Sequence, residues 1–291
     1  MSRIAVAAPD LKRANGRMSV MIVCVILAVF AGYFLLPLWW LGVTATKRQG
    51  DFATTNGFWF SGFHLVENLR ALFGYGDGIF ARWLLNSAIY AGVGALAATV
   101  LSSMTGYYLA KFSFRGRSFL FSIVLGSVMV PSTVLALPLF LVFSKAHLVD
   151  TYWAVLLPSI VSPFGVYLSR IFADSSVPTE IIEAARVDGA GEFRIFTTIA
   201  QRLMLPGLAT VYLFGFVAIW NSFFLPLLML QSQDLYPATF GLYAWKGQAQ
   251  MDPHVQLLVV IGSFVATAPL MAAFLALQRY WRAGLTLGAL D

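Results

Sequence analysis

The sequence has 291 residues, of which 59% are hydrophobic and only 11% are charged. In soluble domains about a quarter of all residues are charged, so this composition excludes an ordinary water-soluble enzyme or binding module. The net charge of +6 does not indicate a nucleic-acid partner, because the basic residues are scattered and contact with anionic lipid head groups explains them. We therefore expect an all-α, polytopic membrane protein that contacts lipid and binds no nucleic acid.

Six stretches are long enough to cross a bilayer and contain no Asp, Glu, Lys, Arg or His. A hydrocarbon core about 30 Å thick needs roughly 20 helical residues. The six stretches run at about residues 18–46, 83–110, 118–144, 151–169, 207–231 and 255–278. We expect residues 1–17 to form a cytoplasmic N-terminal segment and residues 18–291 to form a single transmembrane domain.

The distribution of Lys and Arg predicts how the chain is oriented. Basic residues near the ends of spans are preferentially kept in the cytoplasm. If the N-terminus is inside, thirteen of the nineteen Lys and Arg residues lie on the cytoplasmic side and six on the outer side. Both termini are therefore expected in the cytoplasm.

Two regions between the first and fourth spans have a distinctive composition. Residues 47–82 are rich in Gly and aromatic residues, show no clear helical or strand period, and are expected at the outer membrane surface. The third span contains Pro131 and Pro138, which can kink a helix because proline removes a backbone donor. The prolines bracket Ser132 and Thr133, which we treat as candidates for lining a translocation path. Ordinary shaping of a membrane helix is the alternative explanation.

The sequence shows no sign of an enzyme active site. It lacks a GxxxxGK phosphate loop, a GxSxG elbow and an HExxH motif. His64, His147 and His254 lie in or beside outer loops and are too widely spread to suggest a metal triad. We expect no catalytic residues, no metal and no cofactor bound by this chain.

The six spans also lack the ionisable side chains that proton- or ion-coupled carriers commonly place inside the membrane. Energy for transport would therefore enter from another protein. A stand-alone secondary carrier or channel remains the alternative.

The loop between the fourth and fifth spans concentrates charge in the stretch EIIEAARVDGAGEFRIF, residues 180–196. Pro178 is compatible with a helix start, and Asp188-Gly189 with a helix stop. The pattern predicts a short helix, a turn and a second short helix. Its expected apolar face consists of Phe193, Phe196, Ile199 or Ala200, and Leu203. Such an amphipathic hairpin can dock into a soluble partner or lie on lipid head groups.

The same loop resembles the EAA loop of permease subunits from ATP-binding-cassette importers. The resemblance rests on Glu183-Ala184-Ala185, three residues, Gly189, nine residues and Ile199. In that family the loop, here about residues 174–206, inserts into a cleft of the cytoplasmic ATPase subunit, which hydrolyses the ATP. The resemblance implies that the ATPase is contacted by Glu183, Ala184, Ala185, Asp188, Gly189 and Ala190. One departure is Gln201-Arg202 where the family usually has Leu-Pro, which predicts a shifted break before the fifth span.

Residues 83–291 also resemble the carbohydrate-uptake branch of these importers, in particular the smaller permease of maltose-type systems. The similar stretches are KFSFRGR, VPSTVLALPLF, WNSFFLPLLML and the tail QRYWRAGLTLGALD, whose cytoplasmic part is about residues 279–291. The resemblance implies a type I permease fold in a bacterial inner membrane. It also implies as partners a second homologous permease, two ATPase subunits and an extracytoplasmic solute-binding protein.

The fifth span contains a further candidate for the translocation path. Asn221 is expected to be a buried amide, with Trp220 beside it, and sugars are recognised by amides and stacking aromatic rings. Hydrogen bonding between helices explains Asn221 equally well. In maltose-type relatives the sugar pocket belongs mainly to the larger permease.

Overall fold

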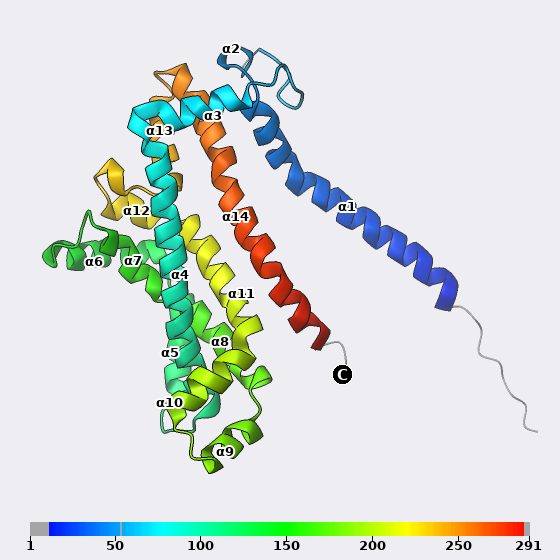
Figure 1. The fold of residues 1–291 in the computed structure, drawn as a ribbon, viewed down its shortest axis with the longest axis vertical. Helices are drawn as coiled ribbons and strands as arrows, with labels where there is room; N and C mark the ends of the chain where they lie inside the picture. Colours follow the sequence, from blue (N-terminus) through cyan, green and yellow to red (C-terminus); the bar gives the residue numbers. More distant parts are fainter. Residues whose placement is uncertain (1–11, 53, 288–291) are drawn as a thin grey trace, which may run out of the picture. The chain divides into compact units, whose positions relative to one another are not determined.

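The computed structural model describes residues 12–52 and 54–287, which are predominantly helical and contain no strand (Figure 1). Contacts divide the chain into two compact units, Met1–Asn68 and Leu69–Asp291. The cytoplasmic segment 1–17, of which residues 1–11 lie outside the described residues, and the single domain 18–291 stay predictions.

The first unit contains α1 (Lys12–Ala45) and α2 (Gln49–Phe52). The side chains of α1 are exposed from residue 18 to residue 39, as expected of an apolar helix surrounded by lipid. Beyond α1, the Asn68 side chain donates hydrogen bonds to the carbonyls of Ala45 and Lys47, at 2.8 and 2.9 Å. These bonds fold the segment after α1 back onto the end of the helix.

The second unit is a bundle of helices. Its elements are α3 (Leu65–Gly74), which begins in the first unit, η1 (Tyr75–Gly78), α4 (Ile79–Lys111), α5 (Arg117–Val128), α6 (Ser132–Lys145), α7 (Tyr152–Ile160), α8 (Pro163–Ser176), α9 (Thr179–Val187), α10 (Glu192–Arg194), the π-helical η2 (Ile195–Ala200), α11 (Gln201–Trp220), α12 (Phe224–Met229), η3 (Gln233–Leu235), α13 (Ala238–Gln248) and α14 (Pro253–Leu287). Residues 47–82 thus contain helices, although no clear helical period was visible in their sequence. In α3, Leu65, Leu69 and Leu72 recur at helical spacing, but the surrounding glycines hide this period.

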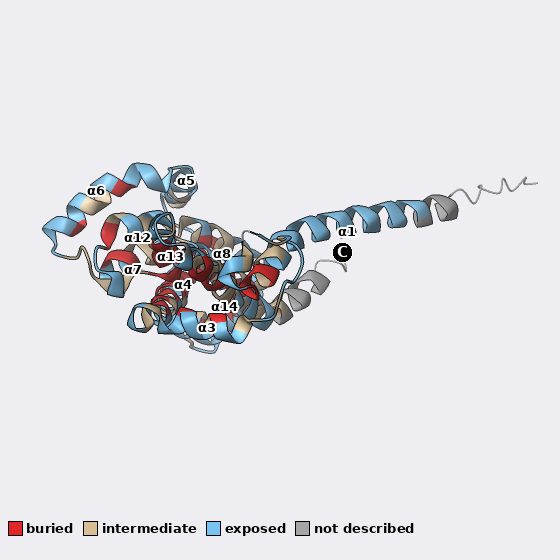
Figure 2. Ribbon diagram, turned by 90° about the horizontal axis from the view of Figure 1, so that it is seen from above, coloured by how far each residue is buried: buried red, intermediate tan, exposed pale blue. Residues whose placement is uncertain are grey.

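Helix α4 is the centre of the second unit and packs along α7, α8 and α11. Figure 2 shows buried residues gathered around α4. Small residues make this packing close. A Cβ atom on Gly106 would lie 2.6 Å from the backbone nitrogen of Arg170 and 2.7 Å from the Ser169 Cβ atom, so only glycine allows α8 to approach here.

Five described helical stretches are long and apolar enough to span a membrane. The number is six if α5 and α6, which meet at a bend of 99°, are counted as one span. The chain thus has the expected six-span, all-α architecture, with the third span broken. Pro131 lies at the break with φ −61° and ψ 130°, outside helical geometry, so α6 begins only at Ser132.

Three of the expected spans have clearly different bounds in the structure. The helical stretch that contains the second span begins at residue 65 instead of 83. The fourth span extends to residue 176, and the fifth covers residues 192–220 instead of 207–231. The helix α11 ends at Trp220, and a short non-helical segment precedes α12. The search for charge-free stretches did not locate the end of α11, because the residues after Trp220 are also apolar.

A carboxylate fastens the turn between α6 and α7 to the segment after α12. Asp150 adopts φ 60°, and its backbone nitrogen donates to the Met229 carbonyl at 2.8 Å. Its carboxylate accepts hydrogen bonds from the backbone nitrogens of Gln231 and Ser232, both at 2.9 Å, and from the Ser232 hydroxyl. Partial burial raises the pKa of Asp150, but the bonds from Ser232 and Gln231 outweigh it and hold the pKa below its ordinary value.

The Asp150 bonds predict a pH-dependent contribution to stability. At pH 7, Asp150→Asn should lower the free energy of unfolding by about 1–3 kcal/mol, because an amide replaces a charged acceptor. Since the folded pKa is depressed, this contribution is complete above the ordinary carboxyl pKa of 3.8 and is lost as pH falls through the folded value. Denaturant unfolding of both proteins in detergent should show the difference shrinking below pH 4. A difference that stays constant down to pH 2 would contradict this assignment.

Candidate functional site: the charged hairpin

The charged loop forms a helical hairpin, residues 179–200, which we call the charged hairpin. Its first helix, α9, begins after Pro178, which has φ −61° and ψ 139°. Glu180 lies in the first turn, where negative charge interacts favourably with the unpaired N–H groups of the helix. The predicted helix start is therefore confirmed.

The turn of the hairpin is a Schellman motif. The backbone nitrogen of Gly189 donates to the Arg186 carbonyl at 3.0 Å, and that of Ala190 donates to the Ala185 carbonyl at 2.9 Å. Gly189 has φ +80°, a left-handed conformation that glycine adopts without steric cost. The spacing of Ala185, Gly189 and Ala190 is thus the spacing that this helix cap requires, and the predicted stop at Asp188-Gly189 is confirmed.

An ion pair closes the hairpin from one helix to the other. Arg186 Nε lies 2.6 Å from Glu192 Oε1. This hydrogen bond to Glu192 raises the pKa of the Arg186 guanidinium above its ordinary value. The pair is exposed, so it orients the two arms and contributes little to stability.

Beneath the hairpin lies an apolar cluster that joins three long helices. Ile182 and Ala185 of α9 are buried in it. The remaining buried members are Tyr107 and Ala110 of α4, Ala173 of α8, Val177, Ile195 and Ala200 of η2, and Met204 and Leu208 of α11. The hairpin is therefore packed against the ends of α4, α8 and α11.

The six residues predicted to contact an ATPase divide into two groups. Glu183, Ala184, Asp188 and Gly189 are exposed and available to a partner. Ala185 is buried in the cluster, and Ala190 is partly buried against it. Ala185 therefore packs inside the hairpin and offers no exposed surface to a partner, whereas Ala190 keeps part of its surface exposed.

Two exposed apolar side chains were missing from the predicted set of ATPase-contact residues. Val187 is 88% exposed and Phe193 is 75% exposed, and both flank the turn of the charged hairpin. Val187 follows Glu183 by one helical turn. This spacing is the signal that would have placed Glu183 and Val187 on the same outward face of α9.

A π-helical turn explains why the two ends of the expected apolar face were wrong. The expected face included Phe193 and Leu203, and the structure exposes both. The expected members Ala200, Phe196 and Ile199 do pack into the cluster, Ala200 fully buried and the other two partly buried. Ile195 and Met204, which were not expected, are fully buried beside them. The wider turn over Ile195–Ala200 changes the register by about one residue relative to an α-helix.

The departure at Gln201-Arg202 does not break the helix. The chain is helical without interruption from Glu192 to Trp220, and Pro206 lies inside α11. The expected shifted break before the fifth span is therefore absent. Gln201 Nε2 instead donates to the buried Ser103 hydroxyl of α4 at 2.8 Å, which ties α11 to α4 just above the hairpin.

The candidates for the translocation path lie in different environments. Trp220 is buried, and its ring stacks on Phe216 at 5.6 Å, so it has no free face for a sugar. Asn221, expected to be buried, is exposed at the end of α11, where its amide donates to the Val217 carbonyl at 2.9 Å. Ser132 and Thr133 are exposed at the start of α6, beside the bend of the third span.

Of the expected cytoplasmic tail, residues 279–287 continue α14. Residues 288–291 lie outside the described residues.

Comparison with known proteins decides the family. Residues 98–286 match the family described as binding-protein-dependent transport system inner membrane component. The chain belongs to this family. It is thus a multi-pass inner-membrane protein and a transport permease, not an enzyme, as the EAA-loop resemblance implied.

Similar permeases cover most of the chain. The arabinooligosaccharides transport system permease protein AraQ of Halalkalibacterium halodurans is 38% identical over 213 residues, 72% of this chain and 74% of the relative. The melibiose/raffinose/stachyose import permease protein MelC of Bacillus subtilis is 29% identical over 280 residues, 95% and 99% of the two chains. The lactose transport system permease protein LacG of Rhizobium radiobacter is 30% identical over 260 residues, 89% and 92%.

A solved structure confirms the fold. It is the crystal structure of a bacterial ABC transporter involved in the import of the acidic polysaccharide alginate, one chain of which superposes with a TM-score of 0.76. The match covers 94% of this chain and 99% of that one, at 21% identity.

The Schellman motif predicts that residue 189 tolerates only certain side chains. Gly189→Val should destabilise the turn by about 1–2 kcal/mol and speed amide exchange of residues 189 and 190 by roughly 5- to 30-fold. No heavy atom lies within 4 Å of a Cβ atom built on Gly189, so the effect comes from backbone conformation alone. Gly189→Asn is the control, because asparagine adopts left-handed geometry more readily. Equal exchange in both variants, measured by mass spectrometry, would refute the motif's role.

The hydrogen bond between Gln201 and Ser103 predicts energetic coupling between α11 and α4. A double-mutant cycle of Gln201→Leu and Ser103→Ala, measured by equilibrium unfolding, should give a coupling energy of about 0.5–1.5 kcal/mol. The control is Gln250→Leu, at an exposed position near the opposite end of the second unit. Its effect on the free energy of unfolding should be additive with that of Ser103→Ala. A coupling within about 0.3 kcal/mol of zero for the first pair would show that the bond is not formed.

Proposed function

We propose that this chain is the transmembrane permease subunit of an ATP-driven importer. With a second homologous permease, it would form the path for a carbohydrate or a similar small polar solute. The printed names of the relatives support this solute class, since they refer to arabinooligosaccharides, to melibiose, raffinose and stachyose, and to lactose.

The observation that carries the proposal is the exposed surface of the charged hairpin. Glu183, Ala184, Val187, Asp188 and Phe193 are all exposed there, which combines apolar side chains with acidic ones. A groove of a water-soluble ATPase subunit accommodates both kinds of side chain. Anionic lipid head groups would repel Glu183 and Asp188, so this surface favours a protein partner over the membrane surface.

The packing of the hairpin supports a mechanical role. Residues 192–220 form one helical stretch about 43 Å long at 1.5 Å per residue, running from the turn into the fifth span. The cluster under α9 also contacts α4 and α8. Displacement of the hairpin would therefore move three long helices together. ATP binding and hydrolysis in two ATPase subunits would drive this displacement, provided that the subunits bind the two access states with different affinity.

The rest of the assembly follows from the same proposal. The chain would lie in a bacterial inner membrane with both termini in the cytoplasm, consistent with the distribution of Lys and Arg. A solute-binding protein would deliver solute on the outer side. ATP would be hydrolysed by the partner subunits, and this chain would bind no cofactor. Ser132, Thr133 and Asn221 stay candidates for the path because they are exposed beside helix breaks.

Docking predicts that exposed hairpin residues retain the ATPase. Val187→Ser and Glu183→Lys should each weaken retention about tenfold, equivalent to about 1.4 kcal/mol, because each removes a contact at the turn. The chain would be expressed with its chromosomal neighbours, purified in mild detergent and quantified for bound ATPase subunit and ATPase activity.

The matched control is Met251→Ser, which alters an equally exposed apolar residue near the opposite end of the second unit and should leave retention unchanged. Recovery of the chain without any ATPase, together with transport in liposomes in the absence of ATP, would favour a stand-alone carrier. Unchanged retention of the ATPase subunit in both hairpin variants would contradict the docking role of the charged hairpin.

A further inference from the structure

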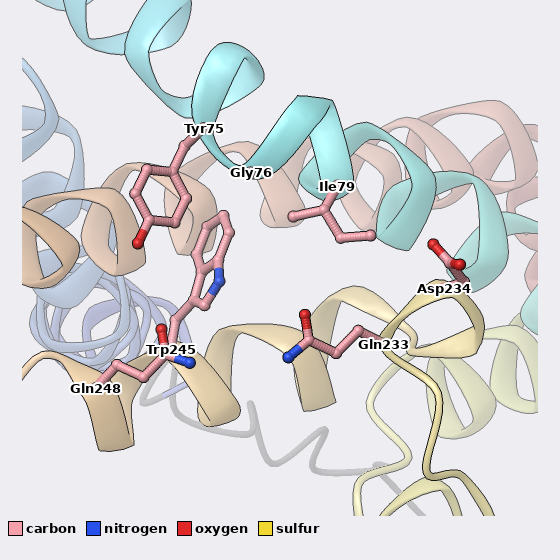
Figure 3. Close-up of a pocket in the computed structure, with 7 residues that line it drawn as sticks. All are labelled: Tyr75, Gly76, Ile79, Gln233, Asp234, Trp245 and Gln248. Atoms are coloured by element: carbon pink, nitrogen blue, oxygen red, sulfur yellow. The ribbon is translucent and has the colours of Figure 1, made fainter.

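A pocket lies at the end of α4 opposite to the charged hairpin (Figure 3). Its volume is about 430 Å³, within the range of small-molecule sites. The residues that line it come from η1, the start of α4, η3 and α13, namely Tyr75, Gly76, Ile79, Gln233, Asp234, Trp245 and Gln248. We call it the Trp245 pocket.

The central group of the pocket is the indole of Trp245, a buried side chain whose N–H has no hydrogen-bond partner in the described part of the chain. The residue is only 4% exposed. A buried tryptophan N–H usually has a partner, as does neighbouring Trp83, which donates to the Gln233 carbonyl at 2.8 Å. The fully enclosed side-chain N and O atoms that lack partners among the described residues are the hydroxyls of Thr44, Tyr107 and Ser169. The indole nitrogen of Trp245 is thus not enclosed by protein, and it faces the pocket (Figure 3).

Two amide side chains complete the set of hydrogen-bonding groups. The amides of Gln233 and Gln248 extend toward the space beside the Trp245 indole from two sides (Figure 3). Within residues 12–52 and 54–287, neither amide forms a side-chain hydrogen bond. Each amide offers two donor hydrogens and an acceptor oxygen, which suits a ligand with neighbouring hydroxyl groups.

The backbone around these groups is held firmly. Asn86 donates hydrogen bonds to the carbonyls of Asp234 and Tyr236, at 2.8 and 3.0 Å, which fixes η3 against α4. The Asp234 carboxylate lies 3.4 Å from the Arg82 guanidinium, so its charge is balanced. The lining therefore favours a neutral ligand over a charged one.

The opposite wall is built on a strained turn. Gly76, Asp77 and Gly78 all have positive φ, including 57° at Asp77, where a non-glycine residue rarely adopts this conformation. The turn places Tyr75 edge-on to Trp245, with ring centroids 5.2 Å apart. Such strain persists where the surrounding structure enforces it, and it is frequent at binding sites.

From this arrangement we propose that the Trp245 pocket is a binding subsite for one or two rings of a neutral carbohydrate. Gln233, Gln248 and the Trp245 N–H would hydrogen-bond its hydroxyl groups, and Tyr75 would contact the apolar side of a ring. The inference rests on the proposed function, whose orientation puts the pocket on the outer side, where solute enters. It adds to this chain a solute contact separate from the path candidates.

The test is photolabelling of the purified transporter complex in nanodiscs with diazirine derivatives of lactose, raffinose and arabinotriose. Labelled peptides would be mapped by mass spectrometry. At least one derivative should label the peptides around residues 75–79 or 245–248, and an excess of the parent sugar should abolish this label. Gln248→Leu should reduce the label at least fivefold. Gln250→Leu, a neighbouring exposed glutamine that does not line the pocket, should leave it unchanged.

Three outcomes would overturn the proposal. The first is the absence of competed label in the pocket with all three derivatives. The second is an equal loss of label in the Gln248 and Gln250 variants. The third is cross-linking of Gln248→Cys to the solute-binding protein without sugar labelling, which would assign the pocket to a protein side chain. ATPase-coupled sugar uptake by the same complex, measured in parallel, separates failure of the pocket from failure of the importer function.

Discussion

The structure depends on the close contact of α4 with α8 and α11. In a membrane the hydrophobic effect does not drive helices together, so their association rests on close packing and hydrogen bonds between them. Gly106 allows the α8 backbone to approach, and the hydrogen bond from Gln201 to Ser103 adds a polar tie to α11. Because these contacts run along one continuous helix, the charged hairpin and the Trp245 pocket are attached to opposite ends of the same rigid element. In the proposed function, such an element would transmit movement between the ATPase and the outer side of the chain.

Local features of the hairpin could be predicted from sequence because they depend on few residues. Pro178 and the Asp188-Gly189 pair specify a helix start and stop through their own backbone preferences, and the structure has both. The family was recognisable for a related reason, since the spacing of Ala185 and Gly189 reflects the geometry of a helix cap. The break near Pro131 was also visible, although the 99° bend was not.

Other features depend on contacts between distant segments or on the hydrogen-bond register of the backbone. The π-helical turn has no signature in the composition, so an α-helical period placed Phe193 inside when it is exposed. Asn221 follows an apolar helix and precedes an apolar segment, and hydropathy alone could not locate the helix end between them. The Trp245 pocket is lined by Tyr75 and Trp245, which lie far apart in the sequence. No local sequence pattern connects these two residues.

The π-helical turn also gives the hairpin a definite angular setting. One residue of an α-helix corresponds to about 100° of rotation around the axis. Deleting a single residue from Ile195–Ala200 would allow an ordinary α-helical turn to form. The segments on either side would keep nearly the same directions around the helix axis, because the wider π-helical turn is what accommodates the additional residue. The π-helical turn therefore lets the charged hairpin and the fifth span each keep their own packing face, although one more residue lies between them than an α-helical turn would hold.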